Sequence, residues 1–129
     1  MRPIDEAYWQ DYFDTHNNRR FVELVDRFYA PDADFENMRV AVKGREDIIA
    51  FLEESNEFVR ITLVPRLIIT QGTVTATELD CILRAEKDMP EFLLGPMEKG
   101  DEVTMRMAAV YHMDGDRIAR ARVYWGRKV

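Results

Sequence analysis

The 129-residue sequence has few of the residues that build covalent cross-links or metal centres. Its single cysteine, Cys81, excludes an internal disulfide. Only two histidines are present, His16 and His112, and no cysteine pair or histidine cluster has the spacing typical of a zinc site. We therefore expect no bound metal and no cofactor.

The sequence also lacks long apolar runs and an excess of basic residues. No stretch approaches the roughly 18 uncharged apolar residues of a membrane span, and the first ten residues lack the apolar run of a signal peptide. The formal net charge is −6, whereas phosphate-rich partners need a basic patch. These absences predict a cytoplasmic protein that binds neither nucleic acid nor membranes.

The spacing of the apolar residues predicts helices first and strands afterwards, in a single domain over residues 1–129. The expected elements are two helices within residues 5–29, a short strand or hairpin up to Gly44, a third helix over 45–57, and extended segments over 58–71, 73–86, 101–113 and 117–126. This order predicts an α+β domain in which helices cover one face of an antiparallel sheet. A pocket between helices and a curved sheet is a preferred place for small ligands.

Alternation within the last two extended segments separates an apolar face from a basic one. The apolar face is expected to carry Val103, Met105, Met107, Ala109, Tyr111 and Met113 from the first segment, and Ala119, Ala121, Val123 and Trp125 from the second. The opposite face carries Arg106, His112, Arg120, Arg122 and Tyr124. Because so many charges suit a core poorly, we expect this outer face to be solvated or to form a homodimer contact.

Four stretches of the sequence carry a resemblance to a known superfamily. They are FYAPDADFENM (28–38), Gly44 before the third helix, FLLGPMEKGDEV (92–103) and YHMDGDRIARARVYW (111–125). The chain resembles the nuclear transport factor 2-like superfamily, which includes ketosteroid isomerase, limonene epoxide hydrolase, scytalone dehydratase and the SnoaL-like polyketide cyclases. The resemblance implies a cone-shaped fold, in which a curved antiparallel sheet wraps around about three helices and encloses a pocket. It also implies a homodimer through the outer sheet face.

Glu78 and Asp80 are the first candidates for chemistry, because residues two apart in a strand point to the same face. Alternation alone does not orient this strand. Residues 77–85 resemble an epoxide-hydrolase strand whose Arg and Asp both point into the cavity; Asp80 matches that Asp, and Glu78 stands where the Arg would be. The resemblance implies that Asp80 is the principal acid/base, supported by Glu78. Alternatively, both lie on a solvated face, or Arg84 or another basic residue holds Asp80.

Asn37 and Tyr12 are the other catalytic candidates. Asn37 matches an epoxide-hydrolase asparagine that positions water, although Phe35 replaces its tyrosine partner; alternatively, Asn37 only caps a turn. Tyr12 lies where ketosteroid isomerases carry a tyrosine that donates to an oxyanion, or it is an ordinary core aromatic.

His16, among polar residues at the end of the same helix, is expected on the surface. Cys81 is expected to be a packing residue.

A small hydrophobic molecule is the expected ligand, and six residues are expected to contact it. They are Phe35, Met105, Met107, Tyr111, Val123 and Trp125, with the two methionines alternatively belonging to an ordinary core. Val123 stands where the relatives carry a catalytic carboxylate, so neither the complete hydrolase mechanism nor the known cyclase acid/base is expected. What remains is a cofactor-independent acid/base enzyme of isomerase, cyclase or dehydratase type, acting on a small carbonyl compound. The alternative is a non-catalytic module that binds a small ligand or forms a dimer.

Overall fold

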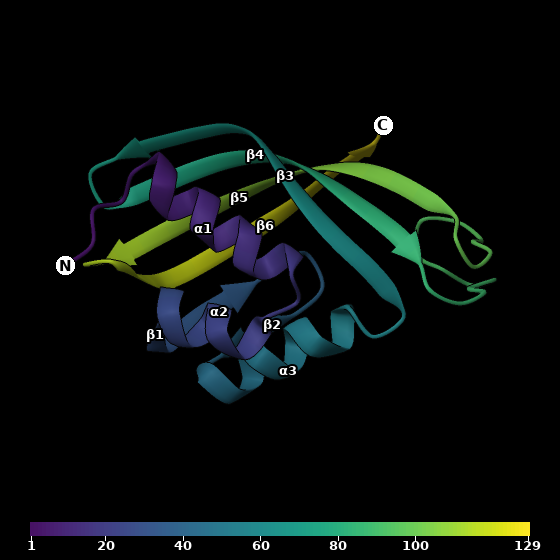
Figure 1. Ribbon diagram of the computed structural model, residues 1–129, viewed down its shortest axis with the longest axis horizontal. Coiled ribbons are helices and arrows are strands. Elements are labelled where there is room, and N and C mark those ends of the chain that lie inside the picture. Colours follow the sequence, from purple (N-terminus) through teal and green to yellow (C-terminus); the bar gives the residue numbers. More distant parts are fainter.

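The computed structural model describes residues 1–129 and contains three helices and six strands (Figure 1). The helices are α1 (Glu6–Asn17), α2 (Phe21–Phe28) and α3 (Arg45–Ser55). The strands are β1 (Tyr29–Glu36), β2 (Ala41–Lys43), β3 (Val59–Gln71), β4 (Val74–Ala85), β5 (Glu102–Asp114) and β6 (Arg117–Lys128). The predicted α+β class and order of elements are confirmed.

The strands form one open sheet in the order β2-β1-β6-β5-β4-β3. Long antiparallel ladders join β3 to β4, β4 to β5 and β5 to β6, as expected for consecutive strands linked by short connections. The exception is the pair of β1 and β6, which run parallel. Because most of the chain lies between these two strands, no hairpin fixes their relative direction. The sheet is therefore mixed, whereas the sequence led us to expect a wholly antiparallel one.

The three helices lie together on one face of the sheet (Figure 1). Helix α1 packs against β3 and α2, while α2 and α3 pack beside β1. Helix α1 begins after Asp5, whose carboxylate accepts a hydrogen bond from the backbone N–H of Tyr8 at 3.0 Å. Its buried face carries Trp9, Tyr12 and Phe13, so the main core lies between the helices and the inner sheet face. None of the helices has the length and apolarity that a membrane crossing requires.

The turn between α1 and α2 is fastened to the middle of β3 by Asn17. The Asn17 side-chain Nδ2 donates to the backbone carbonyl of Leu63, and the Leu63 N–H donates to Asn17 Oδ1, both at 2.9 Å. One side chain thus satisfies both backbone groups of a strand residue. This contact fixes the end of α1 over the sheet, where it borders the cavity described next.

Candidate functional site

A cavity of about 460 Å³ lies between the helices and the inner face of the sheet. Its volume suits a small organic molecule. Twenty of its 25 lining residues are hydrophobic, and no aspartate or glutamate is among them. The remaining five are His16, Asn37, Arg39, Ser55 and Asn56. The cavity is therefore an apolar chamber with few polar groups, and it contains no carboxylate.

All six residues expected to contact a ligand lie in the cavity wall: Phe35, Met105, Met107, Tyr111, Val123 and Trp125. The buried positions of β5 alternate as the sequence predicts. The segment between β4 and β5, which extends past one end of the sheet (Figure 1), adds Phe92, Leu93 and Leu94 to the wall. The wall is thus assembled from strands, helices and one long connection.

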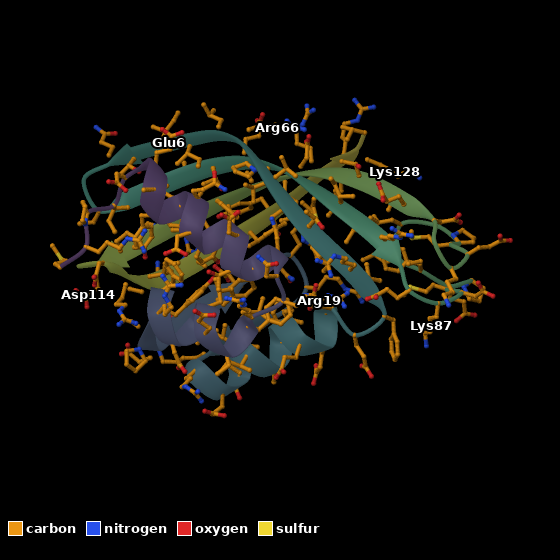
Figure 2. All side chains as sticks on the ribbon, in the orientation of Figure 1. Glu6, Arg19, Arg66, Lys87, Asp114 and Lys128 are labelled. Atoms are coloured by element: carbon orange, nitrogen blue, oxygen red, sulfur yellow. The ribbon has the colours of Figure 1, made fainter.

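Asp80 and Glu78 lie on the outer face of the sheet, so the expectation that they point into the cavity is wrong. In β4 they alternate with Leu79 and Cys81, which are buried and line the cavity. Burying the two carboxylates in place of these residues would cost several kcal/mol, which fixes the strand phase. Asp80 Oδ2 accepts a hydrogen bond from Arg66 Nε at 2.7 Å, and Arg66 points away from the helices (Figure 2). A basic residue therefore holds Asp80, as the alternative interpretation stated.

Asn37 lines the cavity, but its side-chain oxygen is engaged in the turn between β1 and β2. Oδ1 accepts hydrogen bonds from the backbone N–H groups of Arg39 and Val40, at 2.8 and 2.9 Å. The turn-capping alternative is therefore confirmed. The Nδ2 group of Asn37 is left to meet a ligand, so this residue can donate a hydrogen bond but is poorly placed to accept one.

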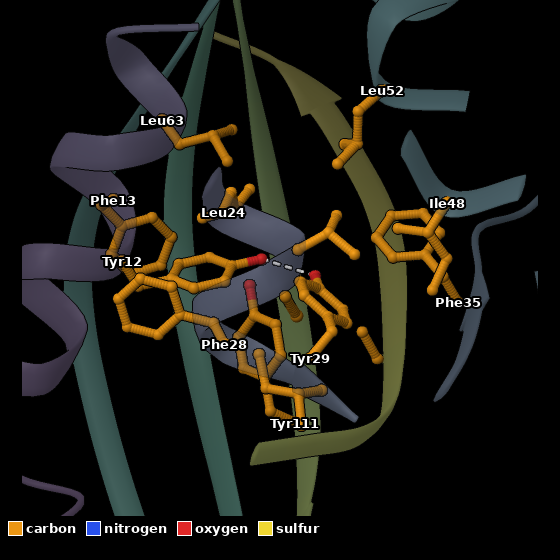
Figure 3. Packing of buried hydrophobic residues seen from close by; sticks show 14 of the residues in the cluster. Tyr12, Phe13, Leu24, Phe28, Tyr29, Phe35, Ile48, Leu52, Leu63 and Tyr111 are labelled. Carbon is orange, nitrogen blue, oxygen red and sulfur yellow. Dashed lines mark hydrogen bonds between the residues drawn. The ribbon is translucent and has the colours of Figure 1, made fainter. Parts of the chain in front are cut away.

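Three tyrosine hydroxyls converge beside the cavity (Figure 3). The hydroxyls of Tyr12 on α1 and Tyr29 on β1 are 2.6 Å apart, and the Tyr111 hydroxyl on β5 points toward them. Tyr12 and Tyr111 line the cavity, whereas Tyr29 does not. Their rings pack edge to face with neighbouring aromatics such as Phe28, which holds them in place. Tyr12 thus combines both interpretations, because it is a core aromatic whose hydroxyl borders the cavity.

Burial keeps all three phenols protonated at neutral pH, because it raises the pKa of Tyr12, Tyr29 and Tyr111 well above that of free tyrosine. Of the three hydroxyls, those of Tyr12 and Tyr29 share a hydrogen bond, whereas the Tyr111 hydroxyl lies in a residue of the cavity wall and has no hydrogen-bond partner in the protein. The Tyr111 O–H group is therefore available to donate a hydrogen bond to a ligand atom.

His16 lines the cavity and is 5% exposed, so the expectation of a surface histidine is wrong. It lies four residues after Tyr12, which places both side chains on one face of α1 about 6 Å apart. This spacing was visible in the sequence, but the polar neighbours of His16 concealed it. Tyr29 was also missed as a partner of Tyr12, because only the fold brings the two together.

The proton of the neutral His16 ring is fixed on Nδ1. Asn17 Oδ1 accepts from the Leu63 N–H, and it lies 3.0 Å from His16 Nδ1. Because an oxygen faces Nδ1, that nitrogen must be the donor. Burial lowers the pKa of His16 below 6.5, with the Asn17 hydrogen bond opposing this shift, so the ring is neutral at pH 7.

Cys81 lies in the same wall, but it is not an activated nucleophile. Burial raises the pKa of its thiol to about 12, and no basic residue accompanies it. At neutral pH the reactive thiolate is therefore very scarce. No three histidine, cysteine, aspartate or glutamate side chains come close enough together to hold a metal ion.

Comparison with known proteins identifies a family and a set of similar folds. Residues 9–121 match the model of the SnoaL-like domain. No curated protein shows significant sequence similarity. A protein assigned as a polyketide cyclase from Xanthomonas campestris pv. campestris superposes with a TM-score of 0.76 at 22% identity, over 93% of this chain and 88% of that chain.

Two further solved structures are similar in fold. A protein assigned as a SnoaL-like polyketide cyclase from Shewanella denitrificans has a TM-score of 0.77 at 18% identity, over 97% of this chain and 92% of that chain. An LEH-like epoxide hydrolase from M. tuberculosis has a TM-score of 0.72 at 18% identity, over 93% of this chain and 80% of that chain. At these identities the similarity establishes the fold alone.

Proposed function

Because the chain belongs to the SnoaL-like domain family, we propose that it binds a small, largely apolar carbonyl compound in the cavity and promotes acid/base chemistry on it. The observation that carries this proposal is the cluster of protonated phenols at the wall of an apolar cavity. The apolar wall would enclose the body of the molecule. A phenol O–H would donate a hydrogen bond to the carbonyl oxygen.

A phenol is an effective donor in this position because the surroundings are dry. In a low-dielectric cavity, a hydrogen bond to an oxygen that gains negative charge stabilises that charge more than the same bond does in water. The rings of Tyr12 and Tyr111 are held rigidly by aromatic packing, so little reorganisation is needed. The proton transfers of such chemistry need no cofactor.

The composition of the cavity wall disfavours a mechanism that uses a carboxylate. Asp80 and Glu78 are on the far side of the sheet, and the wall contains no other carboxylate. A second candidate function, ligand binding without catalysis, is favoured by this same observation.

Binding of 2-tetralone, a bicyclic apolar ketone, tests the proposal by isothermal titration calorimetry. We expect the wild type to bind it, and the Tyr12→Phe and Tyr111→Phe variants to bind about tenfold more weakly, because each loses one donor hydroxyl. Tyr124→Phe is the matched control, since Tyr124 is exposed on the outer sheet face. Equal affinity in all four proteins, or no binding to any, would contradict the proposal.

We also propose that the outer sheet face forms a homodimer. Across four strands of this face lie Leu67, Glu78, Ala108 and Tyr124, in register with one another. Leu67 is 51% exposed and Ile69 is 55% exposed, although both are large and apolar. Acidic side chains and arginines share the face, so a twofold axis can be placed at which opposite charges of the two copies pair.

A further inference from the structure

We infer that His16 is the proton acceptor of the cavity, and that its Nε2 atom takes a proton from the carbon next to the ligand's carbonyl group. This inference rests on the proposed function, because it requires a carbonyl compound held by the phenols. It assigns the acid/base step to α1, and it differs from the sequence-based assignment to Asp80.

The neutral His16 ring can accept a hydrogen bond at only one of its two nitrogens. Nδ1 donates to Asn17, so in the neutral ring Nε2 carries a lone pair. No protein group donates a hydrogen bond to Nε2. Nε2 also retains some accessible surface. The side-chain nitrogen and oxygen atoms that are both fully buried and without a partner belong to Trp9, Arg19, Asp80 and Arg122, and not to His16. Nε2 is therefore an unpaired acceptor with accessible surface in a residue that lines the cavity.

The His16 ring is held in place by contacts on more than one element. Asn17 itself is held by both backbone groups of Leu63, so the chain of contacts runs from the sheet through Asn17 to the imidazole. The Phe21 ring packs edge to face with the imidazole, with centroids 5.6 Å apart. A ring fixed in tautomer and direction by a neighbouring acceptor is the arrangement that general bases require.

The proposed base and the phenol donors lie close enough together to reach one bound molecule. His16 and Tyr12 lie one helical turn apart on one face of α1, about 6 Å between their Cβ atoms. A carbonyl oxygen and its neighbouring carbon are separated by only two bonds. One bound molecule can therefore direct its oxygen to the phenols and its adjacent C–H group to Nε2.

The chemical step balances without any other reactant. The Nε2 lone pair takes the proton, the C–H electrons form a C=C bond, and the electrons of the C=O bond move to the oxygen. A phenol O–H hydrogen-bonds to that oxygen, which becomes an enolate. The imidazolium then returns a proton to the same carbon or to a conjugated one, which gives exchange or isomerisation.

Deuterium exchange tests the inference. In D2O the wild type is expected to accelerate incorporation of deuterium beside the carbonyl of 2-tetralone, as followed by NMR. His16→Gln is expected to lower this rate by at least about a hundredfold while binding of 2-tetralone, measured by calorimetry, persists.

His112→Gln is the matched control and is expected to exchange at the wild-type rate, because His112 does not line the cavity. An exchange rate in His16→Gln equal to that of the wild type would overturn the inference, whereas loss of binding in the wild type would overturn the proposed function.

A second measurement applies even where His16→Gln does not fold. In His112→Gln, His16 is the only imidazole, so its 15N signals can be assigned without ambiguity. At pH 7 we expect a proton on Nδ1 and a bare Nε2. A proton on Nε2, or a doubly protonated ring, would overturn the inference.

Discussion

At the scale of single residues, the site is made by buried polar side chains whose protonation is set by their surroundings. Burial keeps the tyrosine phenols protonated, and the same dryness keeps His16 neutral. A neutral acceptor and neutral donors can share an apolar cavity without the cost of an unpaired charge. The cavity can therefore hold these neutral acid/base groups, whereas a charged carboxylate in the same place would lower the stability of the fold.

Because the pKa of His16 is lowered in the folded protein, we expect the free energy of unfolding to depend on pH. The unfolded chain binds a proton on this ring near pH 6.5, whereas the folded chain binds it only at lower pH. The free energy of unfolding should therefore fall as the pH is lowered through 6.5 toward the folded pKa, by at most about 1.4 kcal/mol per pH unit.

Urea denaturation of the wild type and His16→Gln at several pH values measures this contribution, because other groups cancel in the difference. Asp11 also loses stabilisation in acid, since hydrogen bonding to Arg2 lowers its pKa, but it does so below about pH 4. A difference between the two proteins that stays constant from pH 7 to pH 5 would show that His16 is not held neutral.

At the scale of secondary-structure elements, the turn after α1 decides where the base and the donors lie. Asn17 connects this turn to β3 through Leu63 and to the ring of His16. Asn18, the next residue, makes only an exposed contact with the carbonyl of Asp14. The two neighbouring asparagines therefore form a natural comparison.

Replacing Asn17 with alanine should lower the free energy of unfolding by about 2–3 kcal/mol, because it leaves both backbone groups of Leu63 and the His16 ring without partners. Asn18→Ala should cost less than about 1 kcal/mol. Chemical denaturation checks both values. Similar losses in the two variants would mean that Asn17 does not fasten α1 to the sheet.

Much of the fold could be predicted from these elements, because periodicity reports burial directly. The inward face of β5 follows from its alternation of apolar and polar residues. In β4 both faces carry apolar residues, so Glu78 and Asp80 gave no sign of their direction, and the superfamily resemblance indicated the wrong one. His16 was missed because its burial depends on β3, which is distant in sequence. The parallel pairing of β1 and β6 likewise depends on contacts that no local pattern records.

At the scale of the whole molecule, the two faces of the sheet have different roles. The inner face closes the cavity under the helices, whereas the outer face exposes Leu67, Ile69 and Tyr124 among charged residues. The ion pair of Asp80 with Arg66 belongs to this outer surface. The carboxylate first considered for catalysis therefore lies on the face proposed for dimerisation.

Placing a charge in the middle of that face should prevent dimerisation. Ile69→Lys is expected to sediment as a monomer at micromolar concentration, where the wild type sediments as a dimer, because a buried lysine without a partner is costly. Val22→Lys is the matched control, since Val22 is an exposed apolar residue on α2. A wild type that is monomeric at this concentration would rule out the proposed dimer.

The central claim is that phenols in the cavity polarise a bound carbonyl group. The most direct measurement is the 13C NMR shift of the carbonyl carbon of 2-tetralone bound to the wild type and to Tyr12→Phe/Tyr111→Phe. We predict a downfield shift in the wild-type complex relative to the ketone in a hydrocarbon solvent, and the loss of most of that shift in the double variant. A bound carbonyl carbon with the hydrocarbon-solvent shift in the wild type would contradict the account.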